Sequence, residues 1–177
     1  MNSLLYRILY PFQYIRVARK IPNKAKLRES IFNELVENSI DKKCLQIGVR
    51  EKKHAPHWVS VDKYDESPLI DFNYDVHDLK FDECFFDIAV CNAVLEHVEY
   101  PIKAISELYR VLKPNGLVWV EIPFNQYYHP SPNDYWRVTP EGIKIWMKDF
   151  KEIESGFFKC DNSSFFTGVF FYGTKTT

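Results

Sequence analysis

The sequence is poor in glycine, has no excess of charge of one sign, and spaces its cysteines too irregularly for a metal finger. Its 177 residues include six glycines and carry a net charge of −1, which gives no overall indication of nucleic-acid binding. The four cysteines form no CxxC pair, so no zinc finger is indicated. Free thiols favour a reducing compartment, and we therefore expect a cytoplasmic protein.

Acidic residues are absent from the first 28 positions, which carry seven basic side chains: Arg7, Arg16, Arg19, Lys20, Lys24, Lys26 and Arg28. Arg7, Pro11 and Arg16 interrupt the apolar residues there, so the segment does not read as a membrane-spanning helix. We interpret residues 1–28 as a basic amphipathic N-terminal segment and residues 29–177 as a single domain. The segment either contacts a membrane surface or a protein partner, or packs as a helix on its own domain.

Segments typical of strands and helices alternate along the rest of the chain, which is the pattern of an α/β fold with a mainly parallel sheet. Helices are predicted at 29–39, from Pro101 to the Pro-Asn-Gly breaker at 114–116, and after Thr139-Pro140. Between the first two strands there is room for about one or two helical turns, so we expect a shortened crossover helix there. The strands are predicted at 44–48, 58–62, 85–92, 117–122 and 168–175, the last in a hairpin with part of 150–158.

Parallel sheets bind ligands outside the carboxyl ends of their strands, which makes the residues that follow each strand the first candidates. Gly48 ends the first strand and would allow a ligand to approach the backbone closely. Asp62 ends the second strand, where a carboxylate can accept two hydrogen bonds from a ribose diol. The alternative for Asp62 is a helix cap or a surface acid.

Several motifs follow one another from residue 74 to residue 124: Asp-x-x-Asp-Leu-x-Phe, Phe-Asp-Ile-Ala-Val, Leu-Glu-His-Val and Leu-Lys-Pro-Asn-Gly. In combination they resemble the second half of class I S-adenosylmethionine-dependent methyltransferases of the type 11 group. The later stretch YYHPSPNDYWRVTPEGI resembles a subset associated with cell-surface glycan biosynthesis. The resemblance covers residues 44–145 and implies a Rossmann-like three-layer sandwich whose last strand is antiparallel.

The resemblance also implies S-adenosylmethionine as the cofactor and a position for each of its parts. Gly48 would lie near the methionine part, and Asp62 would hold the ribose. Asp75 and the backbone of Val76 would meet the adenine, and Asn92 with the residues after it would line the floor. The glycine-rich loop of the family is degenerate here, because Gly48 is followed by Val-Arg-Glu.

His97, His129 and Asp134 are the candidates for taking a proton from an acceptor hydroxyl. A structural role is the alternative for His97. In some quinone O-methyltransferases a Glu-His pair similar to Glu96-His97 binds magnesium together with a second Glu three residues earlier. Ala93 stands at that earlier position here, so no metal is expected.

Tyr135, Trp136 and Arg137 are the candidates for holding an acceptor molecule. Aromatic rings can stack on a sugar, and a guanidinium can bind an anionic group. The alternative is a packed loop in which Arg137 pairs with Asp134 and the aromatic side chains fill the core.

The sequence as a whole predicts methyl transfer from S-adenosylmethionine to a hydroxyl of a small molecule or sugar. The retained Asp62, Asp75 and downstream motifs favour this enzyme. The degenerate loop favours the alternative, a non-catalytic binding or scaffold protein of the same fold.

Overall fold

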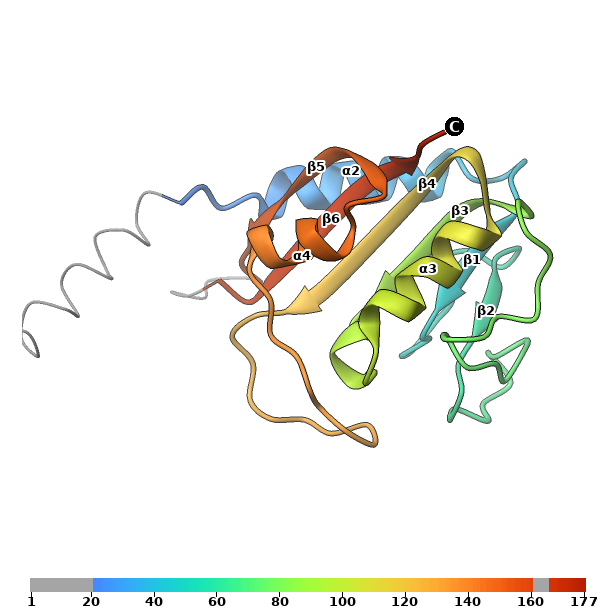
Figure 1. The fold of residues 1–177 in the computed structure, drawn as a ribbon, viewed down its shortest axis with the longest axis horizontal. Coiled ribbons are helices and arrows are strands. Elements are labelled where there is room, and N and C mark those ends of the chain that lie inside the picture. The colour runs from blue at the N-terminus through green and yellow to red at the C-terminus, as the bar shows by residue number, and fades with distance from the viewer. Residues whose placement is uncertain (1–20, 161–165) are drawn as a thin grey trace, which may run out of the picture.

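The computed structural model describes residues 21–160 and 166–177 (Figure 1). Residues 1–20, which hold most of the expected basic segment, lie outside the described residues. The elements follow the chain in the order α2 (Ala25–Glu37), β1 (Cys44–Ile47), β2 (Val59–Val61), β3 (Phe86–Asn92), η1 (Leu95–His97), α3 (Pro101–Val111), β4 (Leu112–Pro123), α4 (Pro140–Trp146), β5 (Phe150–Phe158) and β6 (Gly168–Lys175).

The strands of the described residues form one sheet in the order β2-β1-β3-β4-β6-β5. β1 pairs in parallel with both β2 and β3, and β3 pairs in parallel with β4. β6 runs antiparallel to β4 and forms a hairpin with β5. The predicted Rossmann-like fold, mostly parallel with an antiparallel last strand, is therefore confirmed. Because the strand order reverses between β1 and β3, their carboxyl ends form the edge at which such sheets bind ligands.

Helices cover both faces of the sheet, with α3 and α4 on the near face and α2 behind it (Figure 1). Alternate residues of β3 serve the two faces, because successive side chains of a strand point in opposite directions. Ala89 and Cys91 belong to the cluster packed against α3 and α4, whereas Ile88 and Val90 belong to the cluster beneath α2. This double coverage explains why β3 reads as a continuous apolar run.

α3 ends earlier than the sequence predicts, at Val111 instead of the Pro-Asn-Gly breaker. β4 begins at once with Leu112 and runs through residues 114–116. The register of β4 against β3 shifts over this stretch, from Phe86 opposite Leu112 to Ile88 opposite Leu117. Proline has no backbone N–H to donate to the neighbouring strand. The irregular pairing at this point accommodates the proline, and the strand continues beyond it.

The shortened crossover helix expected between β1 and β2 is not present, since residues 48–58 contain no helix. The buried side chain of Gln46 organises this connection instead. Its Nε2 donates to the Gly48 carbonyl at 3.1 Å, and its Oε1 accepts from the His54 amide at 2.9 Å. These two bonds satisfy loop backbone groups that a helix would otherwise pair.

α2 begins at Ala25, four residues before the helix predicted from the sequence. Lys24 and Arg28, which the sequence assigned to the N-terminal segment, form ion pairs with Glu154 of β5 and Glu121 of β4. Within residues 21–160 and 166–177, no helix is long and apolar enough to cross a membrane.

Candidate functional site

The candidate residues gather at the carboxyl edge of the parallel strands, where β1, β3 and β4 end. η1 follows β3 at this edge, and the long connection of residues 124–139 follows β4 (Figure 1). A surface hollow of about 450 Å³ lies at the opposite edge. It contains none of the candidates and is lined by Ser106, Tyr109, Lys148, Asp149 and Thr176.

Gly48 adopts a backbone conformation that favours glycine, with φ at +75°. A Cβ added to it would lie 2.5 Å from Cγ2 of Val94, so a side chain here would collide with the segment after β3. Its amide donates to the carbonyl of Val61 at 2.8 Å, which joins the ends of β1 and β2. The lone glycine is therefore required by the geometry of this edge.

Asp62 lies just after β2 and is half-buried. Its Oδ1 accepts hydrogen bonds from the amides of Tyr64 at 2.8 Å and Asp65 at 2.9 Å, which fixes the following turn. Its Oδ2 accepts no hydrogen bond from the residues that the structure describes. Oδ1 thus caps a turn instead of a helix, and Oδ2 is not used by this turn.

Asn92, the last residue of β3, lies beside Gly48. Its carbonyl oxygen is 3.8 Å from the position that a Cβ of Gly48 would occupy. Its side-chain Oδ1 is buried and has no hydrogen-bond partner in the described part of the chain. An unpartnered buried amide oxygen is unfavourable unless a ligand or water completes it.

Asp75 is already engaged by protein groups. It accepts hydrogen bonds from Nζ of Lys63 at 2.8 Å and from the amide and Nδ1 of His77 at 2.9 and 2.7 Å. Partial burial alone would raise the pKa of Asp75, but these hydrogen bonds outweigh it and lower the pKa to about 2. Val76 is buried beside it. Asp75 and Val76 therefore form a fixed wall of the site, and the Asp75 carboxylate is already occupied by protein donors.

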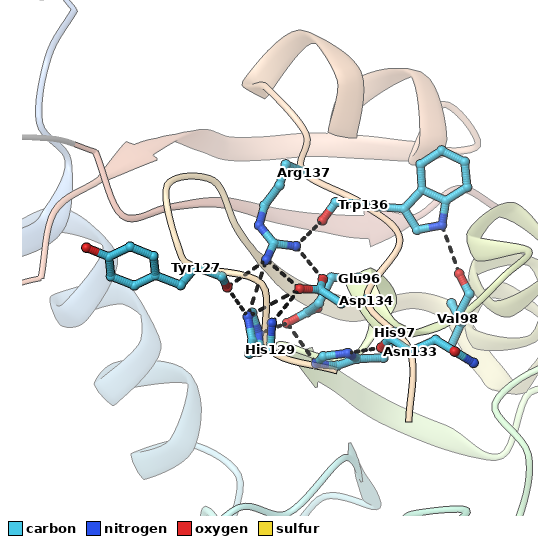
Figure 2. A network of polar contacts seen from close by, with 9 residues as sticks. All are labelled: Glu96, His97, Val98, Tyr127, His129, Asn133, Asp134, Trp136 and Arg137. Atoms are coloured by element: carbon cyan, nitrogen blue, oxygen red, sulfur yellow. Dashed lines mark hydrogen bonds and ion pairs between the residues drawn. The ribbon is translucent and has the colours of Figure 1, made fainter. Parts of the chain in front are cut away.

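A second group of polar residues joins η1 to the connection after β4 (Figure 2). The amide of Tyr135 donates to the Glu96 carbonyl at 2.7 Å, and that of Trp136 does so at 3.3 Å. Asp134 and Arg137 form a two-pronged ion pair at 2.5 and 2.8 Å, the pairing that their three-residue spacing suggested. Asp134 also accepts from the amide of His129 at 2.8 Å.

The Arg137 guanidinium holds the pKa of Asp134 well below its usual range. Arg137 is correspondingly engaged, because it also donates to the carbonyls of Trp136 and Tyr127. The pair shapes the loop and positions His129, so neither charge is left fully available to a substrate.

Glu96 is the site residue that sequence reasoning missed. Its side chain is 0% exposed, and neither carboxylate oxygen has a hydrogen-bond partner among the described residues. Burial raises the pKa of its carboxyl to about 8. Nε2 of His97 and Nε2 of His129 lie 3.6 and 3.9 Å from its Oε1. The Leu-Glu-His motif places Glu96 next to His97 in sequence. Only the tertiary structure shows that the Glu96 side chain is buried.

The aromatic candidates border this cluster with different degrees of freedom. Trp136 donates its indole N–H to the Val98 carbonyl at 2.9 Å and meets the Trp146 ring edge-on at 5.8 Å. It is 37% exposed, and Tyr135 is 46% exposed. Trp136 is therefore anchored with one part of its ring accessible, while Tyr135 is open to solvent.

Comparison with protein families gives one match: a family model described as a methyltransferase domain matches residues 28–120. Comparison with curated proteins gives no match.

Many solved structures share the fold. The Burkholderia thailandensis 1,6-didemethyltoxoflavin N1-methyltransferase, solved with bound 1,6-didemethyltoxoflavin and S-adenosylhomocysteine, has a TM-score of 0.66 and 12% identity, covering 100% of this chain and 92% of its own. The N-methyltransferase NodS of Bradyrhizobium japonicum, solved with S-adenosylhomocysteine, has a TM-score of 0.64 and 16% identity, with 93% and 98% covered.

A third solved structure is a Haloferax volcanii complex between a methyltransferase and the Trm112 methyltransferase activator. Its TM-score is 0.59 at 13% identity, covering 82% of this chain and 88% of the other. At these identities the likeness establishes the fold, and the residues at the carboxyl edge must be judged by their own geometry.

Proposed function

The chain belongs to the methyltransferase domain family, and on this premise we propose that it transfers a methyl group from S-adenosylmethionine to a hydroxyl of a small molecule or sugar. The single observation that carries the proposal is the arrangement at the carboxyl edge. Gly48, Asp62 and Asn92 lie there at the ends of three neighbouring strands. Among the described residues, the buried Oδ1 of Asn92 has no hydrogen-bond partner, and the turn after β2 uses only Oδ1 of Asp62.

These residues fit the cofactor. Because Gly48 has no side chain, the methionine part of the cofactor can approach the backbone at the end of β1. Oδ2 of Asp62, which the turn does not use, suits a ribose hydroxyl. The buried Oδ1 of Asn92, unpartnered among the described residues, suits a polar hydrogen of the ligand. When bound, S-adenosylmethionine supplies a methyl group on a positively charged sulfur. The S-adenosylhomocysteine bound in the NodS structure supports this choice of cofactor.

The adenine is assigned to the wall formed by Asp75 and Val76. Lys63 follows Asp62 directly and forms an ion pair with Asp75. This ion pair connects the residue proposed for the ribose with the residue proposed for the adenine. Asp75 would have to exchange one of its present donors for the exocyclic amine of the adenine. Binding through the backbone of Val76 requires no such exchange.

The acceptor hydroxyl is assigned to the cluster of Glu96, His97 and His129. The Nε2 atoms of His97 and His129 face this cluster and can accept a proton, so the hydroxyl proton would leave toward these two rings. Asp134 supports the reaction indirectly, because its ion pair with Arg137 makes it a poor base and its bond to the His129 amide positions the ring.

A sugar acceptor is supported by the partly exposed rings of Tyr135 and Trp136 beside the cluster, since aromatic faces stack on sugars. The resemblance of this loop to the glycan-biosynthesis subset points the same way. A contact with a membrane surface or a protein partner through the basic segment at residues 1–28 is a separate proposal, of which the membrane contact is tested here. Comparing the sedimentation of the full chain and of a chain lacking residues 1–20 with anionic liposomes tests it.

The decisive experiment is calorimetric titration of the Asp62→Asn variant with S-adenosylhomocysteine. Asparagine keeps the Oδ1 acceptor of the turn but replaces Oδ2 with a donor that cannot accept from ribose. Because a hydrogen bond to a charged group contributes about 1.5–3 kcal/mol, we expect binding to weaken by roughly 10- to 150-fold. The matched control is Asp65→Asn in the same loop, whose carboxylate accepts from the amide and hydroxyl of Ser67.

Failure of the folded, unsubstituted protein to bind S-adenosylhomocysteine would contradict the proposal and favour the non-catalytic scaffold. Equal binding by the Asp62 and Asp65 variants would keep the cofactor but remove Asp62 from its site.

A further inference from the structure

Oε1 of Glu96 and the Nε2 atoms of His97 and His129 meet beside η1 at distances too long for direct hydrogen bonds. The Glu96 carboxylate is completely buried, and neither of its oxygens has a hydrogen-bond partner in the described part of the chain. Nε2 of His97 lies 3.6 Å and Nε2 of His129 lies 3.9 Å from Oε1 of Glu96 (Figure 2). Both distances exceed the range of about 2.7–3.2 Å for N–H···O hydrogen bonds, so a shared proton does not account for the spacing.

The other nitrogen of each ring fixes the tautomer. Nδ1 of His97 lies 2.6 Å from the carbonyl oxygen of Asn133, which can only accept, so Nδ1 carries the hydrogen. Nδ1 of His129 lies 2.8 Å from the carbonyl oxygen of Tyr127 in the same way. An Arg137 nitrogen lies 3.2 Å from the same Nδ1, but the carbonyl contact is shorter. In the neutral rings both Nε2 lone pairs therefore point toward Glu96.

We propose that Glu96, His97 and His129 bind a divalent transition-metal ion, with Zn²⁺ the best fit. The three donor atoms lie within 4.8 Å of one another. Zinc lies about 2.0–2.2 Å from histidine nitrogens and carboxylate oxygens, so two donors of one ion are at most about 4.3 Å apart. The two distances to Glu96 already satisfy this limit. A small inward rotation of the exposed His129 ring brings the third within it.

The ligand set selects the kind of metal. Imidazole nitrogens favour Zn²⁺ and its transition-metal neighbours, whereas Mg²⁺ and Ca²⁺ prefer oxygen ligands. Two histidines and one carboxylate are a set found in catalytic zinc sites, which keep a further position open. The carbonyls that hold the two Nδ1 atoms are the partners that metal-bound histidines usually have. The His129 side chain is 39% exposed, so an ion can enter from solvent.

This inference departs from the expectation that no metal binds, which rested on Ala93 standing where a third ligand was sought. His129 supplies that ligand from the connection after β4 instead, 32 positions beyond His97 in sequence. The role of the metal rests on the proposed function. Its open position would take the oxygen of the acceptor hydroxyl, and His97 and His129 would then act as ligands instead of bases.

The test uses the full-length, tag-free protein after removal of bound metal with a chelator. Titration calorimetry with ZnCl₂, MnCl₂ and MgCl₂, with metal content measured by mass spectrometry, should give one Zn²⁺ per chain, weaker Mn²⁺ binding and no Mg²⁺ binding. Glu96→Gln and His129→Asn should each weaken Zn²⁺ binding by about 100-fold or more. His57→Asn, a histidine away from the cluster, is the matched control and should bind as the unsubstituted protein does.

Repeating the titration with Cys84 and Cys160 changed to serine excludes binding by the exposed thiols. Circular dichroism of each variant establishes that it is folded. Absence of Zn²⁺ binding by the folded protein, or undiminished binding by both cluster variants, would overturn the inference. Titration of S-adenosylhomocysteine without metal is independent of this outcome, so failure of the metal site and failure of the proposed function are distinguishable.

Discussion

His54 is a half-buried histidine whose environment disfavours its charged form. Its ring packs edge-on against Phe32 at 4.9 Å and Trp58 at 5.4 Å, and its Nε2 has no hydrogen-bond partner among the described residues. Burial, assisted by the nearby Lys52, lowers the pKa of His54 to about 4. Because of this one residue, we expect the stability of the folded protein to depend on pH.

We expect the protein to lose stability as the pH falls through the window between about 6.5 and 4. In that window an unfolded histidine, with a pKa of about 6.5, binds a proton that the folded His54 does not, so acid favours unfolding. Urea unfolding of His54→Leu should show a smaller loss over this window than the unsubstituted protein. The control is His57→Leu in the same loop, and an unchanged slope in the His54 variant would contradict the prediction.

At the scale of elements, α3 holds in place the stretch between β2 and β3, in which residues 62–85 form no helix or strand. Arg110 donates to the carbonyls of Phe81 and Leu79 at 2.8 and 2.7 Å. Glu107 pairs with Arg110 and accepts from the amide of Leu79 at 2.8 Å. The buried face of α3 and these polar contacts together fix the segment that carries Asp75 and Val76.

Replacing Arg110 with alanine should lower the free energy of unfolding by about 2 kcal/mol, because hydrogen bonds made by a charged group contribute about 1.5–3 kcal/mol and these share one side chain. Urea unfolding measures the change. Lys103→Ala, on the exposed side of the same helix, should stay within about 0.5 kcal/mol of the unsubstituted protein. Equal effects of the two substitutions would show that the helix does not depend on this network.

At the scale of the whole molecule, ion pairs as well as apolar contacts hold α2 against one face of the sheet. Arg28 forms a two-pronged ion pair with Glu121 at 2.7 and 2.6 Å and lies 4.3 Å over the Phe158 ring. Glu121 is largely buried and also accepts from the Trp119 indole at 2.8 Å. We therefore propose that the folded domain begins before α2, at about Lys24, and not at residue 29.

Two truncations test this boundary. Deleting residues 1–20 should leave the melting temperature within about 2 °C of the full chain. Deleting residues 1–28 should lower the free energy of unfolding by about 3 kcal/mol or more, because it leaves the buried Glu121 carboxylate without its partner. Arg28→Ala should reproduce most of this loss, and Lys26→Ala, exposed on the same helix, should not. Equal stability of the two truncated chains would restore the boundary at residue 29.

Local sequence signals were sufficient for the sheet and for most of its helices. Apolar runs such as that of β3, the Pro101 start of α3 and the Thr139-Pro140 start of α4 act within a few residues, so their outcome does not depend on distant partners. Gly48 and Asp62 could be selected from sequence because each stands directly after a strand. The ion pair of Asp134 with Arg137 also follows from spacing alone.

Features that depend on distant residues required the tertiary structure. Gln46 organises the connection in which a helix was predicted, and pairing with β3 includes the Pro-Asn-Gly segment in β4. The ion pair of Arg28 with Glu121 joins α2 to the sheet. The burial of Glu96 is of the same kind, since it arises where η1 meets a loop that returns after β4. No local pattern encodes such a meeting, because the free energy of a buried carboxylate depends on what the rest of the fold places around it.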